Sequence, residues 1–332
     1  MNGNSIINFI HSLQEPVPQY VLGCIPAIAT MGAAPSSGLL NKLLWIFRCL
    51  GCPFTGLFYY CNINNNPIAM SAYWLDSDQF VKKENGNENV ESKIKYRPVG
   101  HYAMDIASEK EQEENVVKLL RECIAESSVL DRLSSLASAY YIFVGILIGI
   151  TKAINAGQCT GSDWPYLPLL LAWTLPAIYK RVFGGKMVVN DPSVILRGGG
   201  NTKELVVRVK ELQYNKKSAQ DARVIITLVL FSMIIPWITV LLAYFTRPVG
   251  YGCRSKYITV LCSIWSLNSF VAYVSHISGE KFVSGNRFMN GWFCLCGVII
   301  AILIIILGLL SHTQSWWIDL FGNVCKINCD NV

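Results

Sequence analysis

The residues best suited to chemistry form a polar stripe on one apolar segment, residues 257–276. Hydroxyl and imidazole side chains recur there at steps of three and four residues, the spacing of a single helix face, and an amide lies beside them. A helix that faces lipid gains nothing from such a face, because each unpaired hydroxyl group in hydrocarbon costs free energy. We define the polar stripe as Thr259, Ser263, Ser266, Asn268, Ser269, Tyr273 and His276.

The polar stripe favours transport as the function, and a membrane adaptor is the alternative. In the first, a transporter or channel-like protein uses it to line a route for a neutral or weakly charged solute, beside a helix kinked at Pro236, where the proline frees the carbonyl of Ser232. No charged residue lies deep in the strongly apolar segments, which argues against a proton pump or voltage sensor. In the second, the stripe joins packed helices, and the protein is a non-catalytic membrane adaptor that binds partners or anionic lipid.

A glycine run is a second candidate site. It precedes a segment expected to form a helix from Asn201 to near Tyr214, and the backbone amides of such a turn can hold a lipid phosphate. The alternation of Leu205, Val207 and Val209 favours a strand instead. The candidate phosphate-binding residues are Arg197, Gly198, Gly199 and Gly200.

Four of the twelve cysteines fall in segments expected on the non-cytoplasmic side. An even number of cysteines in an oxidising compartment is what disulfide bonds require. The hypothesis is two disulfide bonds among the outer loops and tail, with the pairing open; the alternative is four free thiols. The candidates are Cys159, Cys253, Cys325 and Cys329.

No catalytic residue, metal site or cofactor is expected. The four histidines stand in none of the motifs typical of metalloproteases or hydrolases. The net charge of +6 comes from basic residues beside apolar spans, which favours anionic lipid headgroups over nucleic acid as the partner. The other expected partners are a second copy of the chain or a cytoplasmic protein.

The elements that must position these residues are membrane helices. Of 332 residues, 52% are hydrophobic and only 15% charged, which predicts an all-α polytopic membrane protein of the plasma membrane or an endomembrane. Residues 39–61 carry Lys42 and Arg48 and are expected to lie along the membrane surface; a full crossing there gives seven spans instead of six. A kink is also expected at Pro176. The six expected spans are 19–34, 136–154, 164–179, 224–245, 257–276 and 291–311.

The distribution of Lys and Arg predicts the sidedness. Regions 62–135, 180–223 and 277–290 hold nine, ten and two of these residues, against five in the segments at the other ends of the spans, so the first three are expected to be cytoplasmic. A helix over 108–136 is expected to continue into the membrane, and 187–189 and 194–196 to pair as strands. The expected divisions are 1–61 (N-terminal span and interfacial segment), 62–135 (cytoplasmic linker and amphipathic helix), 136–179 (transmembrane pair), 180–222 (basic cytoplasmic loop), 223–311 (three-helix transmembrane unit) and 312–332 (non-cytoplasmic tail).

Overall fold

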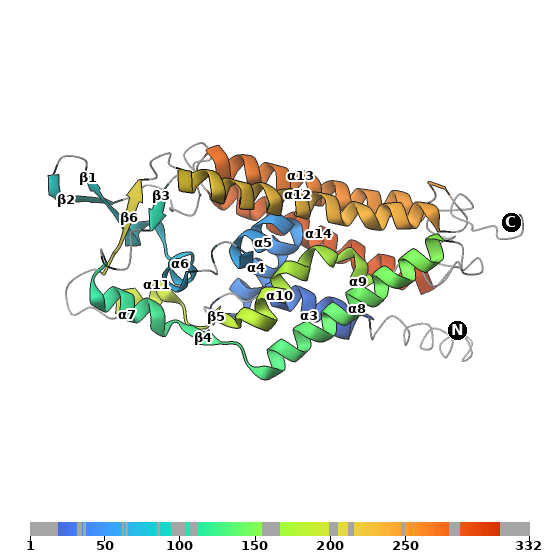
Figure 1. Cartoon of the computed structure of the whole chain (residues 1–332), viewed down its shortest axis with the longest axis horizontal. Helices are drawn as coiled ribbons and strands as arrows, with labels where there is room; N and C mark the ends of the chain where they lie inside the picture. The colour runs from blue at the N-terminus through green and yellow to red at the C-terminus, as the bar shows by residue number, and fades with distance from the viewer. Residues whose placement is uncertain are drawn as a thin grey trace, which may run out of the picture.

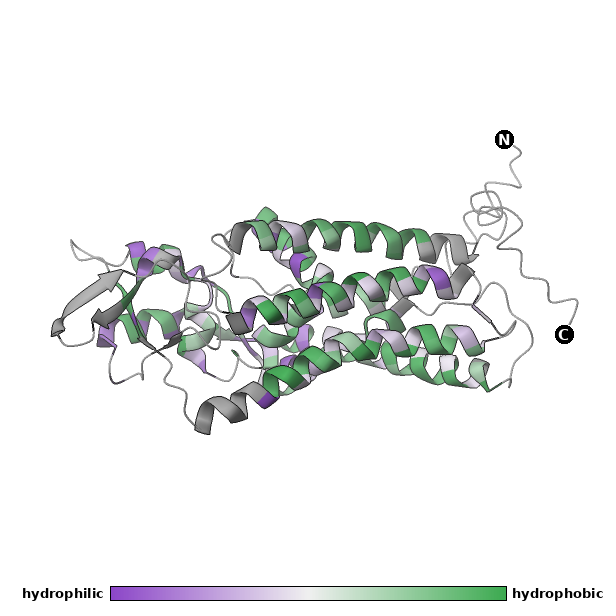
Figure 2. Cartoon of the chain, turned by 90° about the horizontal axis from the view of Figure 1, so that it is seen from above, coloured by the Kyte–Doolittle hydropathy of each residue, from purple (hydrophilic) through white to green (hydrophobic). Residues whose placement is uncertain are grey.

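The computed structural model is a bundle of long helices with a smaller polar part at one end (Figure 1). It is mostly helical. Apolar residues dominate the bundle, whereas the hydrophilic residues gather in the part at its end (Figure 2). The structure describes residues 19–31, 35, 38–61, 63, 66–84, 87–93, 104–106, 110, 112–154, 167–198, 205–211, 216–246, 250–251, 253–278 and 286–312.

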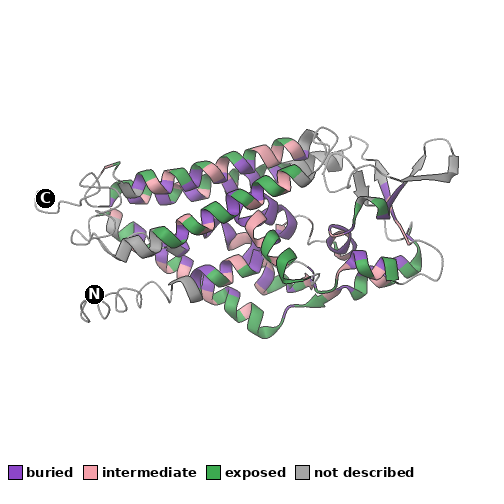
Figure 3. Cartoon of the chain, turned by 180° about the vertical axis from the view of Figure 1, so that it is seen from behind, coloured by how far each residue is buried: buried purple, intermediate pink, exposed green. Residues whose placement is uncertain are grey.

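Four helices of the described chain are long and apolar enough to cross a membrane, or five spans if the bent pair described below counts as one. Their outward faces are exposed and their inward faces buried (Figure 3). On the last helix the exposed residues include Ile299, Ile302 and Ile305, which suit contact with lipid. These features support an integral membrane protein. The four helices are α8 (Val129–Ala153), α12 (Lys216–Phe245), α13 (Cys253–Ser278) and α14 (Asn286–His312).

The segment expected at the membrane surface is instead a bent helix pair inside the bundle. Helix α4 (Leu39–Gly51) and helix α5 (Pro53–Cys61) meet at an angle of 106°. Every residue from Pro53 to Tyr60 is buried, and α5 packs against α10 (Leu175–Gly184), α12 and α13. The surface-helix prediction is therefore wrong for α5, because neighbouring helices cover all its faces.

Two of the expected spans are short or broken helices. Residues 19–31 form a π-helical turn (Gln19–Cys24) and α3 (Ile25–Met31), and residues 167–184 form α9 (Leu167–Leu170), a 3₁₀ turn (Ala172–Thr174) and α10. Pro176 lies in the first turn of α10, where its missing N–H removes no hydrogen bond. The kink predicted at Pro176 is therefore wrong, because the break precedes the proline.

We call the smaller polar part at the end of the bundle the polar domain. It combines two regions that are distant in the sequence. Its main sheet has the order β2-β1-β6-β3, with β1 parallel to β6 and antiparallel pairing at both edges, and a second antiparallel pair joins β4 to β5. Helices α6, α7 and α11 complete it. The bounds are α6 (Pro67–Ala72), β1 (Phe80–Glu84), β2 (Asn87–Lys93), β3 (Met104–Ile106), α7 (Glu114–Glu122), β4 (Ile124–Glu126), β5 (Lys186–Val188), α11 (Pro192–Gly198) and β6 (Val207–Glu211).

A separate hydrophobic core holds the polar domain together. Val207 and Val209 of β6 are buried against Val116 and Leu120 of α7. This packing explains why 207–211 is a strand and not part of the expected helix: alternation puts both valines on the buried face. The continuous helix over 108–136 is also wrong, since β4 separates α7 from α8, and the strand expected at 194–196 lies in α11.

The thiol of Cys123 gives the polar domain a pH-dependent property. Cys123 is 1% exposed, and its Sγ donates to the Leu119 carbonyl at 3.2 Å. Burial raises its pKa to about 11, and the carboxylates of Asp191 and Glu122 add to the rise. Because this folded-state pKa lies above the ordinary value of 9.0, the resulting stabilisation is complete below pH 9 and is lost between pH 9 and about 11.

We therefore expect Cys123 to resist alkylation at pH 7 while the protein is folded and to react readily after unfolding. The measurement is the maleimide reaction rate of a variant that keeps Cys123 as its only cysteine. Cys123→Ala is the control for stability, and its unfolding temperature should fall less than that of wild type between pH 9 and 11. Equal alkylation rates in folded and unfolded protein would contradict the prediction.

Candidate functional site

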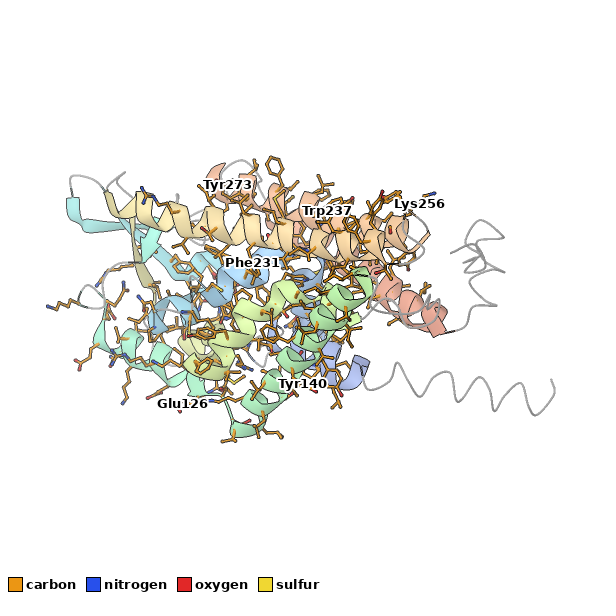
Figure 4. All side chains as sticks on the ribbon, turned by 45° about the vertical axis from the view of Figure 1, so that its right-hand side comes forward. Glu126, Tyr140, Phe231, Trp237, Lys256 and Tyr273 are labelled. Carbon is orange, nitrogen blue, oxygen red and sulfur yellow. The ribbon has the colours of Figure 1, made fainter. Side chains whose placement is uncertain are left out.

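The polar stripe lies on α13, but its members face different neighbours. Thr259 donates to the Ser255 carbonyl of its own helix at 2.7 Å, and Ser263 is exposed. Ser266 Oγ accepts a hydrogen bond from Trp237 Nε1 of α12 at 2.9 Å. In Figure 4, Tyr273 lies toward the polar end of α13 and Lys256 toward the opposite end. The stripe therefore runs along most of the bundle and does not converge on one point.

Asn268 supports the break between α4 and α5. Its Nδ2 donates to the Gly51 carbonyl at 2.8 Å, while its Oδ1 accepts from Trp292 Nε1 of α14 at 3.1 Å. One turn earlier, Trp265 Nε1 donates to the Leu50 carbonyl at 2.6 Å. The last carbonyls of a helix have no partner within it, and water is absent from an apolar interior. These two side chains of α13 therefore act as a side-chain cap for α4.

The remaining members face α5. The His276 ring lies 4.7 Å from Phe58, and the Tyr273 ring lies 6.5 Å from Phe54. Ser269 Oγ is buried and has no hydrogen-bond partner among the residues that the structure describes. Sequence reasoning missed Trp265 and Trp292, whose indole N–H groups complete this network. The sequence feature that could have indicated this network is Cys52-Pro53. A helix that ends there inside an apolar segment needs hydrogen-bond donors from other helices for its last carbonyls.

Pro236 lies inside α12 as expected. Its carbonyl oxygen accepts a hydrogen bond from Cys262 Sγ of α13 at 3.3 Å. Ser232 is fully buried, and its hydroxyl donates to the Val229 carbonyl one turn earlier. The wall expected beside the polar stripe is thus in contact with α13 at both Trp237 and Pro236.

In the candidate phosphate site, the arginine already pairs with two carboxylates. Arg197 Nη2 lies 2.8 Å from Asp76 and 3.4 Å from Asp78. Gly198 is the last residue of α11, Gly199 and Gly200 lie outside the described residues, and the next described element is the strand β6. Two neighbouring acids compete with a phosphate for this arginine, so the geometry disfavours the predicted site.

The four disulfide candidates stay untested. Cys159, Cys325 and Cys329 lie outside the described residues, and only the backbone of Cys253 is described, at the start of α13.

A second candidate site, built of aromatic rings and one arginine, lies where the bundle meets the polar domain. Four aromatic rings, each in contact with the other three at 4.8–5.9 Å between centroids, join α4 and α5 to the residues that follow α6. We call these rings the aromatic cluster. Beside it lies the guanidinium of Arg181, in the last turn of α10, where it interacts electrostatically with Tyr59. The aromatic cluster consists of Trp45, Tyr59, Tyr73 and Trp74.

The aromatic cluster is held by hydrogen bonds as well as by packing. Trp45 Nε1 donates to the Met31 carbonyl at 2.7 Å, and Trp74 Nε1 donates to the Tyr59 hydroxyl at 2.9 Å. Aromatic pairs of this geometry contribute about 0.5–1.5 kcal/mol each beyond the area they bury. The cluster therefore fixes the polar domain to the bent helix pair.

Comparison with known proteins adds no constraint on this site. No protein-family model, no curated protein and no solved structure matches the chain. The function must therefore be argued from the chemistry of its own residues.

Proposed function

We propose that the protein is a non-catalytic membrane adaptor. Its apolar helices hold the polar domain at the cytoplasmic face of a membrane, where that domain binds a protein partner or anionic lipid. The observation that carries this proposal is the use of the polar stripe in hydrogen bonds between helices, at Ser266 and Asn268. Side chains engaged in this way join helices and do not offer a continuous polar wall to a solute.

The proposal includes six crossings with the polar domain on the cytoplasmic side. In this topology the segments 19–31 and 167–184 complete the bundle formed by α8, α12, α13 and α14. It is supported by the excess of Lys and Arg in the regions 62–135, 180–223 and 277–290. It is also supported by the arrangement of the described helices, because α12 begins and α13 ends near the polar domain (Figure 1).

Cysteine labelling in intact membranes tests both parts of the proposal. We expect Ser266→Cys, in a background without other reactive cysteines, to resist a small polar maleimide until the protein is denatured. Glu122→Cys in the polar domain should react only when the reagent reaches the cytoplasmic side, and Lys256→Cys only from the opposite side; both native side chains are exposed. Ser263→Cys controls for a position on α13 that does not face α12. Rapid labelling of Ser266→Cys would refute the packed arrangement.

Passage of a neutral or weakly charged solute is the second candidate function. The observation that favours it is a pair of buried hydroxyls, Ser269 Oγ and Thr239 Oγ1, which have no hydrogen-bond partner in the described part of the chain. Such groups are expected to bind water or a polar solute. If solute flux through reconstituted protein exceeded that of empty vesicles and fell in Ser269→Ala, this function would replace the adaptor.

A further inference from the structure

Arg181 is a buried cation with no counter-charge among the described residues. Its side chain is 6% exposed and shares the buried face of α10 with Ala177 and Ile178. Nε and Nη1 of its guanidinium have no hydrogen-bond partner in the part of the chain that the structure describes. Two other arginines, Arg132 and Arg197, each lie within 4 Å of a carboxylate.

No acidic side chain in the described ranges neutralises this charge. A guanidinium keeps its proton in proteins, so Arg181 cannot become neutral as a buried lysine can. The C-terminal turn of α10 helps, because a helix C-terminus carries about half a negative elementary charge, but this charge is spread over several carbonyls and leaves the N–H groups unpaired. Burial of an unpaired charge is among the most costly arrangements in a folded protein. An anion bound at Arg181 would therefore stabilise the folded protein.

A second buried donor, the Tyr59 hydroxyl, lies on α5, which packs against α10. The Tyr59 hydroxyl is buried and accepts a hydrogen bond from Trp74 Nε1 at 2.9 Å, so its own proton remains for an acceptor. Helix α5, which carries this hydroxyl, packs against α10, which carries Arg181, and the positive charge of Arg181 acts on the hydroxyl. Two neighbouring groups thus present N–H and O–H donors, and no carboxylate within the described ranges forms an ion pair with Arg181.

The location suits a phosphate group. Arg181 lies one turn before Gly185, which ends α10 and begins the connection to β5. The rings of Tyr179 and Phe183 lie on the outer face of this turn, both exposed and 4.7 Å apart, and such aromatic residues are typical of the membrane–water interface. Lipid phosphates lie at that depth, and an arginine binds phosphate through several N–H groups at once.

We propose that Arg181 and Tyr59 bind a phosphate group at the junction of the helix bundle and the polar domain. The phosphate belongs either to a lipid headgroup or to free phosphate, and the experiment distinguishes these sources. The proposal depends on the membrane location of the bundle and not on whether the protein is an adaptor or a transporter.

The test measures the unfolding temperature of full-length protein that has been stripped of bound lipid by detergent exchange. One arm adds inorganic phosphate, a second adds micelles containing dioleoyl phosphatidic acid, and a third adds dioleoylglycerol, which lacks the phosphate. At a hundredfold excess over Kd, we expect the unfolding temperature of wild type to rise by about 5 °C in the first or second arm. A rise with phosphatidic acid alone identifies a lipid headgroup, and a rise with inorganic phosphate identifies the free anion.

Variants connect the rise to the proposed residues. Arg181→Gln should abolish it. Arg132→Gln should retain it, because Arg132, an arginine of α8 whose guanidinium lies against Gly185 at the end of α10, is paired with Glu126. Tyr59→Phe should raise Kd about tenfold. If Arg181→Gln does not fold, Arg181→Lys and Tyr59→Phe decide the matter, and an unchanged Kd in both overturns the proposal. An equal rise with dioleoylglycerol, a rise that persists in Arg181→Gln, or no rise in any arm overturns it as well.

Discussion

Replacing Gly297 with alanine is expected to push α4 away from α14 and to destabilise the bundle by about 3 kcal/mol. A Cβ at Gly297 collides with the backbone of Phe47 and Gly51, and a Cβ at Gly51 collides with the backbone of Phe293 and Gly297. A flexible side chain can move away from an added methyl group, but helix backbone cannot do so without widening the whole contact. Since α4 packs more extensively on α14 than on any other element, the loss is expected to be large.

The measurement is the free energy of unfolding in detergent for Gly297→Ala, Gly51→Ala and the double variant. Both single changes widen the same contact, so the double variant should cost less than the two losses added together. Gly291→Ala is the matched control on α14, because no atom lies within 4 Å of its added Cβ. Alanine also favours a helix over glycine, and this control should be neutral or slightly stabilising. Equal effects at Gly297 and Gly291 would show that the close contact does not contribute to stability.

Replacing Asn268 with alanine is expected to cost about 2–4 kcal/mol. The loss leaves the Gly51 carbonyl and the Trp292 indole N–H without the partners described above. Hydrogen bonds between membrane helices average only about 0.6 kcal/mol, because a displaced group usually finds another partner. Asn268 is 1% exposed, and the Gly51 carbonyl belongs to a helix end in the interior, where water does not replace the lost donor. The larger value is therefore expected.

Ser263→Ala is the control for this prediction, because Ser263 is an exposed member of the same stripe. Its effect should stay within about 0.5 kcal/mol. A double-mutant cycle between Asn268→Ala and Trp292→Phe should give a coupling energy of about 1 kcal/mol. A coupling near zero would mean that the network at the α4–α5 break does not act as a unit.

Membrane character and the helical face of the polar stripe were both predictable from the sequence. Their physical origin is local: the hydropathy of a segment and the 3.6-residue period depend only on residues next to one another in the chain. The same local information failed for 205–209 and for the supposed helix over 108–136. In both places the outcome depends on packing between α7 and β6, which come from regions about ninety residues apart.

The sequence by itself determined that the chain is rich in membrane-spanning helices and that one of them, α13, carries polar residues on one face. Only the tertiary structure decided what those residues contact: Asn268 caps a helix that ends in the interior, and Ser266 pairs with Trp237. It also decided that Arg181, which the sequence placed at the start of a basic loop, is buried beside Tyr59. The physical reason is that hydrogen-bond partners and counter-charges are set by proximity in space, which the order of residues along the chain does not specify.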